Sequence, residues 1–211
     1  RVFTRKNFNV DAFANYQLVQ ENFKTIERLF NIEFNRDWNL TTIQGNQSLL
    51  ISGLNFDFKE KGIAKYQIEK LDFSDFFSGT RHIFQGIYRT KKLTVQQNSS
   101  FLKSSGNISN TTFLRNETQA RYQFGKNWVG SSLRLEDNQE KLTVTNQLSA
   151  LSQRFSEYGA FIGRGDSTKV YAELGYLHRV NDSLQNGFLQ RVNKSNSYYL
   201  KSKLIQNEKD R

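Results

Sequence analysis

The stretch that decides the fold is Phe155-Ser-Glu-Tyr-Gly-Ala-Phe-Ile-Gly-Arg164, followed by Gly165-Asp-Ser167 and a return segment from Thr168 to Arg179. On the return segment, every second residue shares a side. One side carries Val170, Ala172, Leu174 and Tyr176, and the other carries Tyr171, Glu173, Gly175 and Leu177. Alternation over about ten residues is typical of a β-strand, and the Gly-Asp-Ser run is typical of a tight turn. The stretch therefore predicts an antiparallel hairpin.

The same period of two recurs through most of the chain. The segments that show it are 50–58, 63–73, 81–95, 112–124, 128–136, 184–192 and 198–206. Turn residues separate several of them, at Glu60-Lys-Gly62, Gly125-Lys-Asn127 and Asn181-Asp-Ser183. Consecutive hairpins without helices between them indicate a meander. We expect an all-β fold in which residues 42–211 form one antiparallel β-sheet or barrel segment.

Residues 1–41 have a different texture, and we expect an irregular arm there. Between Asp11 and Phe30, apolar residues stand at 13, 16, 19, 23, 26 and 30. This spacing fits one face of a short helix with Asp11 as its N-cap, or an extended segment with aromatic anchors. Large aromatic side chains are favoured at protein interfaces. The candidates for a protein interface are Phe13, Tyr16, Phe23, Phe30 and Trp38.

Composition favours strands and does not exclude a transmembrane barrel, and strand length suits one. Only 36% of the residues are hydrophobic but 14% are aromatic, a balance that favours strands with one apolar face. No run approaches the roughly 18 apolar residues that a membrane-spanning helix needs, whereas about ten residues suffice for a tilted strand. The strands therefore read as part of an outer-membrane β-barrel. Residues 94–105 are polar on both sides, which favours either a barrel wall extended into water or a soluble sheet.

The formal charge of +10 favours anionic partners such as nucleic acid, anionic lipid or acidic protein. The alternative is a dispersed surface excess, because the basic residues form no block of five or six. One local group, Arg81, Arg89, Lys91 and Lys92, is a candidate for contact with anionic lipid. No recognition motif accompanies the charge, so we expect no nucleic acid as partner.

The residues of catalysis and metal binding are scarce. The chain has no cysteine, which excludes disulfides, thiolate metal sites and cysteine nucleophiles. Its two histidines, His82 and His178, lack partners at the spacing of a metal site, and no Gly-x-Ser-x-Gly is present. The sequence predicts no enzyme, no cofactor and no metal.

Two segments carry a family resemblance. Ile26-Glu-Arg-Leu-Phe-Asn-Ile-Glu-Phe-Asn-Arg-Asp-Trp-Asn-Leu40 and His178-Arg-Val-Asn-Asp-Ser-Leu-Gln-Asn-Gly-Phe188 resemble large outer-membrane β-barrel proteins of Bacteroidota. The resemblance implies an envelope location, a longer parent chain and no catalytic residues. Asp166-Ser-Thr168 and Asp182-Ser-Leu184 also look like the short O-glycosylation sequence of that phylum, with Ser167 and Ser183 as acceptors. A plain Asp/Ser turn is the alternative.

These observations favour a non-enzymatic outer-membrane β-barrel component with a role in transport, assembly or scaffolding. The alternative is a soluble periplasmic or cell-surface β-sheet module that binds glycan, lipopolysaccharide or a protein. The chain starts at Arg1 and contains no methionine, so we expect a processed chain or a fragment whose export signal is gone. We expect its partners to be other envelope proteins or the rest of a longer chain, and outer-membrane lipid or lipopolysaccharide.

Overall fold

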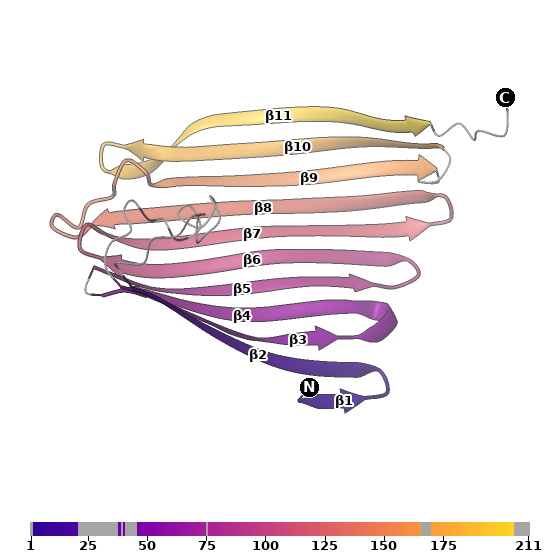
Figure 1. Cartoon of the computed structure of the whole chain (residues 1–211). Coiled ribbons are helices and arrows are strands. Elements are labelled where there is room, and N and C mark those ends of the chain that lie inside the picture. Colours follow the sequence, from indigo (N-terminus) through magenta and orange to yellow (C-terminus); the bar gives the residue numbers. More distant parts are fainter. Residues whose placement is uncertain are drawn as a thin grey trace, which may run out of the picture.

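The structure is a computed structural model that describes residues 2–20, 38, 40, 46–74, 76–165 and 170–204. The described residues form one antiparallel sheet of eleven strands in sequence order, as Figure 1 shows. This confirms the predicted all-β meander. The strands are β1 (Phe3–Arg5), β2 (Phe8–Val19), β3 (Gln47–Asp57), β4 (Gly62–Phe73), β5 (Phe77–Arg89), β6 (Leu93–Gly106), β7 (Ser109–Phe124), β8 (Asn127–Leu142), β9 (Gln153–Gly165), β10 (Val170–Gln185) and β11 (Phe188–Leu204).

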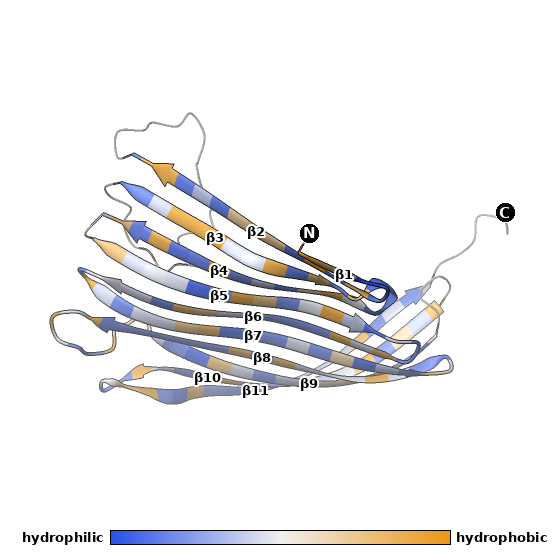
Figure 2. Cartoon of the chain, turned by 90° about the horizontal axis from the view of Figure 1, so that it is seen from below, coloured by the Kyte–Doolittle hydropathy of each residue, from blue (hydrophilic) through white to orange (hydrophobic). Residues whose placement is uncertain are grey.

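The sheet is open. Strands β1 and β11 lie at opposite edges in Figure 1, and within the described residues each pairs with a single neighbour. Figure 2 shows that the sheet is curved and that its strands alternate between hydrophilic and hydrophobic residues. One end of the sheet carries the turns at 58–61, 90–92 and 125–126, and we name it the Lys92 end, on the right of Figure 1. The opposite end is the Ser152 end.

The pairing register sorts the side chains onto two faces. Directly paired residues point to the same side, so a row of partners can be followed across the sheet. One such row is Gln85, Asn98, Glu117, Arg134, Glu157 and Arg179; its side is the polar face. The row one residue over is Phe84, Ser99, Asn116, Leu135, Ser156 and Val180; its side is the apolar face.

One apolar cluster interrupts the polar face near the Ser152 end. Trp38, which is 1% exposed, belongs to one buried cluster with side chains from four strands of that face, and its ring meets Phe77 edge-on with centroids 6.5 Å apart. The buried members of this Trp38 cluster are Trp38, Leu49, Leu71, Phe73, Leu102 and Phe113. Burying side chains of this size stabilises the fold by roughly 1.5–3 kcal/mol each. The cluster therefore holds Trp38 on the polar face.

Glycines within the strands receive aromatic rings from the neighbouring strand. A Cβ atom placed on Gly163 would lie 2.2 Å from the Trp128 ring, and one on Gly175 would lie 2.2 Å from the Tyr199 ring. Both contacts lie on the polar face, because Gly163 pairs with Trp128 and Gly175 with Tyr199. Only a residue without a side chain lets the ring lie across the strand in this way.

Several sequence expectations need correction. Residues 8–19 are strand β2, so the first half of the possible helix at 11–30 is extended and the arm is not irregular there. The segment predicted as one strand at 81–95 is the end of β5, a turn at 90–92 and the start of β6. The turn expected at 181–183 is also wrong, because β10 continues to Gln185 and the chain turns at Asn186 and Gly187, both with positive φ.

Candidate functional site

The polar face carries a ladder of paired charges across its middle. Arg115 donates to Glu136 at 2.9 Å, and Arg134 lies 3.4 Å from Glu157. Glu157 also faces Arg179 at 3.9 Å on the next strand. The guanidinium of Arg179 in turn lies 4.1 Å from the centre of the Phe155 ring. Opposite charges on directly paired residues stabilise strand pairing, so this ladder joins β7 to β10.

A second group of cations, at the Lys92 end of the polar face, is not paired in this way. Two adjoining hollows of about 460 and 690 Å³ share Gln119, Arg121, Gln123 and Glu173. We name them together the basic hollow. Its charged lining comprises Arg89, Lys91, Lys92, Arg121, Lys126, Lys201 and the single carboxylate Glu173.

Glu173 is held by three neighbours. The Trp128 indole N–H donates to one carboxylate oxygen at 3.0 Å, and the Tyr199 hydroxyl donates to the other at 3.2 Å. The Lys201 ammonium lies 3.9 Å away. Among the residues that the structure describes, Arg89, Lys91, Lys92, Arg121 and Lys126 make no ion pair. The hollow is thus a site of uncompensated positive charge.

Arg121 stands at the centre of the basic hollow. Its guanidinium lies 4.1 Å from the centre of the Trp128 ring, an arrangement that fixes the plane of the side chain while its N–H groups stay able to donate. Gln119 and Gln123 flank it two residues away on the same face of β7. These groups are all hydrogen-bond donors, which suits an anion.

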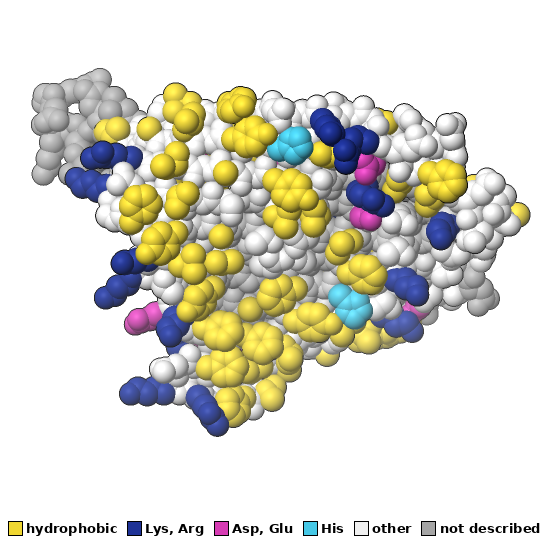
Figure 3. Space-filling view, turned by 180° about the vertical axis from the view of Figure 1, so that it is seen from behind, with side chains coloured by type: hydrophobic (Ala, Val, Ile, Leu, Met, Phe, Trp, Pro, Cys, Tyr) yellow, Lys and Arg dark blue, Asp and Glu magenta, His cyan; other side chains and the backbone are white. Residues whose placement is uncertain are grey.

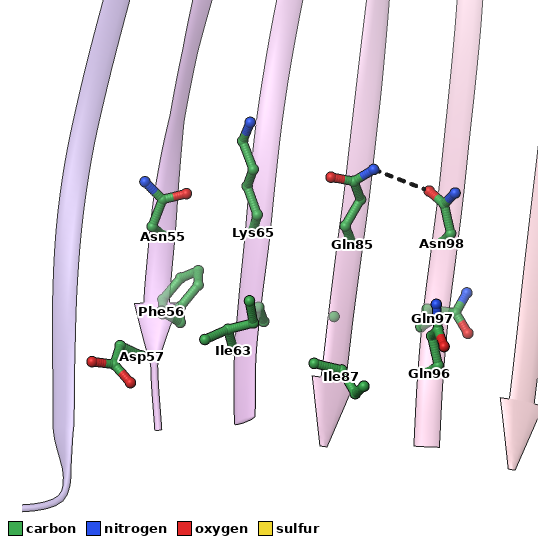
Figure 4. Close-up of a pocket in the computed structure, with 12 residues that line it drawn as sticks. Asn55, Phe56, Asp57, Ile63, Lys65, Gln85, Ile87, Gln96, Gln97 and Asn98 are labelled. Atoms are coloured by element: carbon green, nitrogen blue, oxygen red, sulfur yellow. Dashed lines mark hydrogen bonds between the residues drawn. The ribbon is translucent and has the colours of Figure 1, made fainter. Parts of the chain in front are cut away.

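A third hollow, of about 470 Å³, adjoins the basic hollow through Gln96. Figure 4 shows Asn55, Lys65, Gln85 and Asn98 side by side on neighbouring strands, and Gln85 donates to Asn98 at 3.5 Å. The next row toward the Lys92 end carries Ile63 and Ile87. The third hollow and the basic hollow together extend over the polar face from β3 to β11.

The sequence candidates for anion contact divide between two places. Arg89, Lys91 and Lys92 line the basic hollow. Arg81 lies elsewhere, 3.7 Å from Glu69, with both side chains largely buried. Sequence reasoning missed Arg121, Lys126 and Lys201. Arg121 stands between Gln119 and Gln123 in a period-two segment, but nothing local to the sequence shows that β11 brings Lys201 to the same place.

The remaining candidates are scattered. Phe13 lies on the polar face against Gly53, Tyr16 is exposed on the apolar face, and Trp38 is buried in its cluster. Ser183 lies within β10, not in a turn. Phe23, Phe30 and Ser167 lie outside the described residues.

The histidines form no site with each other. The Tyr66 hydroxyl and His82 Nδ1 are 2.8 Å apart, and His178 Nδ1 lies 2.7 Å from the Asn196 side-chain oxygen. Both lie on the apolar face. The described part of the chain holds no group of three His, Cys, Asp or Glu side chains placed to bind a metal. It also contains no helix that is long and apolar enough to span a membrane.

Comparison with known proteins adds no identity to this geometry: no family model, no curated protein and no solved structure matches the chain.

Proposed function

We propose that this chain forms part of the wall of an outer-membrane β-barrel, with its apolar face against lipid and its polar face toward the lumen, and that it serves transport, assembly or scaffolding without catalysis. One observation carries the proposal. In the described strands, the apolar face has a central band without Asp, Glu, Lys or Arg; charged side chains of that face border it toward the Ser152 end on several strands, and Arg164 borders it toward the Lys92 end. Figure 3 shows this face, where hydrophobic side chains spread from β2 at the bottom to β11 at the top.

The height of the uncharged band fits the apolar belt of a protein that spans a bilayer. On β9 the bordering charges Arg154 and Arg164 are ten positions apart. On β4, β6 and β8, the border toward the Ser152 end is Lys70, Lys103 and Asp137, and the apolar-face positions from there to the start of each strand carry no charge. At about 3.3 Å per residue and a tilt of about 40°, ten positions span roughly 25 Å. The apolar belt of an outer-membrane barrel is about 25 Å tall.

The band also runs obliquely across the rows of paired residues. On β11 its border toward the Ser152 end is Lys194, whose row leads to Tyr66 on β4, four residues short of the border at Lys70. Toward the Lys92 end the uncharged band shifts in the same direction: the row of Gly62, the first residue of β4, leads to Ala160 on β9, four residues before the charge of Arg164. Strands in a barrel are tilted, so a flat membrane border must cross the rows at a slant.

Polar side chains within the band form hydrogen bonds with one another. The Gln97 amide and the Ser99 hydroxyl donate to the Asn116 side-chain oxygen at 2.6 and 2.8 Å, and the Asn116 amide donates to Thr118 at 3.2 Å. Thr118 donates back to Gln97. Neutral groups with internal partners cost less in hydrocarbon than unpaired ones. The polarity of residues 94–105 on both sides is therefore compatible with lipid contact.

Two adjacent residues of β8 test the proposal, since the chain has no cysteine of its own. Leu133 points to the apolar face and Ser132 to the polar face. We expect a fluorophore on Leu133→Cys to be quenched strongly by lipids that carry a nitroxide in the acyl chain, and one on Ser132→Cys to be quenched weakly. The measurement is made on full-length protein in phosphatidylcholine vesicles. Equal quenching at both positions contradicts the proposal.

The two edges of the sheet require covering strands. In the described residues the outer backbone groups of β11 and of most of β2 have no strand partner, and hydrocarbon does not tolerate such groups. Under this proposal, more of the same polypeptide or a partner protein of the envelope supplies the missing strands.

We accordingly expect residues 1–211, expressed alone and purified in detergent, to be heterogeneous in size and to form no steady pore. Size-exclusion chromatography with light scattering measures the first, and conductance across a planar bilayer measures the second. A monodisperse, heat-resistant monomer with stable conductance would show that the sheet closes by itself.

A soluble envelope module is the second candidate. The observation in its favour is a set of hydrogen-bonded polar side chains in the middle of the apolar face: Gln97, Ser99, Asn116 and Thr118. Polar side chains of this kind are also well solvated by water. Under this reading the protein stays in the aqueous phase when the vesicles are sedimented, and neither cysteine probe is quenched.

A further inference from the structure

The geometry points to the basic hollow as a binding site for a soluble multivalent oxyanion, such as a pyrophosphate or phosphate-ester group, that approaches from the polar face. The inference deepens the proposed function, because such a site would lie on the lumen side of the wall. Its support is the local charge and the shape of the hollow, which do not depend on closure of a barrel.

Two regions of the polar face, the ladder of paired charges and the basic hollow, differ in how their cations are compensated. In the ladder of Arg115, Arg134 and Arg179, each cation has a carboxylate within 4 Å. In the basic hollow, six cations meet one carboxylate, and Glu173 is already engaged by Trp128, Tyr199 and Lys201. Like charges held together without counter-charge raise the local concentration of anions. A ligand with several negative oxygens gains most from this arrangement.

Aromatic rings that lie across glycines form the floor of the basic hollow. The Trp128 ring lies across Gly163, and Phe161 lies across Gly130, where a Cβ atom would be 2.2 Å from its ring. Rings that lie along the sheet leave space above them, and the hollow of 690 Å³ lies over Trp128. Arg121 projects into this space from β7, with Lys126 at the adjoining turn and Lys201 on β11. Donors therefore converge from three sides.

The position of the hollow selects a soluble ligand over a lipid headgroup. Arg121 and Glu173 point to the polar face, opposite to Leu174 and Tyr122 on the same strands. A lipid whose chains lie along the apolar face would have to bring its phosphate around the turns of the sheet to reach Arg121. Under this inference, Arg89, Lys91 and Lys92 would serve the solute site and not lipid contact.

The test is isothermal titration calorimetry of full-length protein in zwitterionic detergent micelles, with inorganic pyrophosphate as probe. We expect saturable binding at about 50 mM salt that weakens strongly at about 500 mM. The double variant Arg121→Gln with Lys126→Gln should lower the affinity by about tenfold or more, because it removes two charged donors. Arg134→Gln is the matched control: it removes one cation from the same face and should leave the affinity nearly unchanged.

Three outcomes would overturn the inference: no saturable heat with wild-type protein, equal affinity of wild type and double variant, or an equal loss in the Arg134→Gln control. Far-UV circular dichroism checks the fold of each variant. If Arg121→Gln disturbs it, the pair Lys92→Gln and Lys126→Gln, both exposed side chains, takes its place. A second titration, in micelles that contain phosphatidylglycerol, should give the same affinity; competition would assign the site to lipid headgroups. Binding in micelles requires the folded sheet but not its insertion into a bilayer. The titration can therefore fail while the cysteine probes still support the barrel wall, and the reverse also holds.

Discussion

Leu174→Arg is expected to cost about 2–4 kcal/mol of unfolding free energy in lipid vesicles, the range for an arginine at the midplane of a barrel wall. Leu174 is 56% exposed on the apolar face, and its row partners across the sheet are Ile162 and Leu200. The charge would have no counter-ion at that depth. Equilibrium unfolding by urea, followed by far-UV circular dichroism in phosphatidylcholine vesicles, measures the loss.

The matched control is Asn98→Arg on β6, an exposed position of the polar face that pairs directly with Glu117. There the new guanidinium meets water and a carboxylate, so we expect a change within about 0.5 kcal/mol, as for most surface substitutions. Glu173, the neighbour of Leu174, does not serve as this control, because its carboxylate holds Trp128, Tyr199 and Lys201. Equal tolerance of Leu174→Arg and Asn98→Arg would refute a lipid-facing role for this row.

Trp38→Ala is expected to destabilise the protein by about 3–5 kcal/mol, the usual cost of removing a buried tryptophan. Its ring is almost fully buried in a cluster that includes Leu71, Phe73 and Leu102, so the substitution leaves a cavity in that cluster. The loss should be the same in detergent and in lipid vesicles, because Trp38 lies on the face away from the proposed lipid. Chemical unfolding in both media decides this.

Phe188→Ala provides the comparison for Trp38. Phe188 is 72% exposed beside the turn between β10 and β11, and its truncation removes little packing. We expect a change within about 0.5 kcal/mol. A Trp38→Ala cost as small as that of Phe188→Ala would mean that Trp38 is not packed on the polar face.

The sequence was sufficient for the fold class and for the faces of its most regular hairpin. Period two assigned Val170, Ala172 and Leu174 to one side, and the structure places all three on the apolar face. The assignment from period two failed where the apolar residues also had the spacing of a helical face. Phe13 and Tyr16 are three apart, as on a helical face, yet in β2 they point to opposite sides and pair with Gly53 and Leu50. Pairing with β3, thirty or more residues away, decides that segment, and no local pattern reports it.

One turn was predictable but missed. Asn186-Gly187 is the dipeptide of a two-residue hairpin whose central residues both need positive φ, and their φ values are 51° and 82°. The turn predicted at Asn181-Asp-Ser183 ended the strand several residues before its true end at Gln185. The basic hollow was beyond sequence reasoning for a different reason. Arg89, Arg121 and Lys201 come from β5, β7 and β11, and only the full register brings them to one end of one face.

The strict neighbour-to-neighbour order of the strands has a consequence for how a barrel of the proposed kind would change size. Because, within the described residues, each strand bonds only to the strands before and after it in sequence, each hairpin is a self-contained unit of growth. An extra hairpin at an edge leaves every existing pair in place, including the ring of Trp128 over Gly163 and the pairing of Arg134 with Glu157. The diameter of a closed barrel increases with its strand number. Under the proposed function, duplication or loss of hairpins would therefore widen or narrow the bore while the chemistry of the remaining lining stays intact.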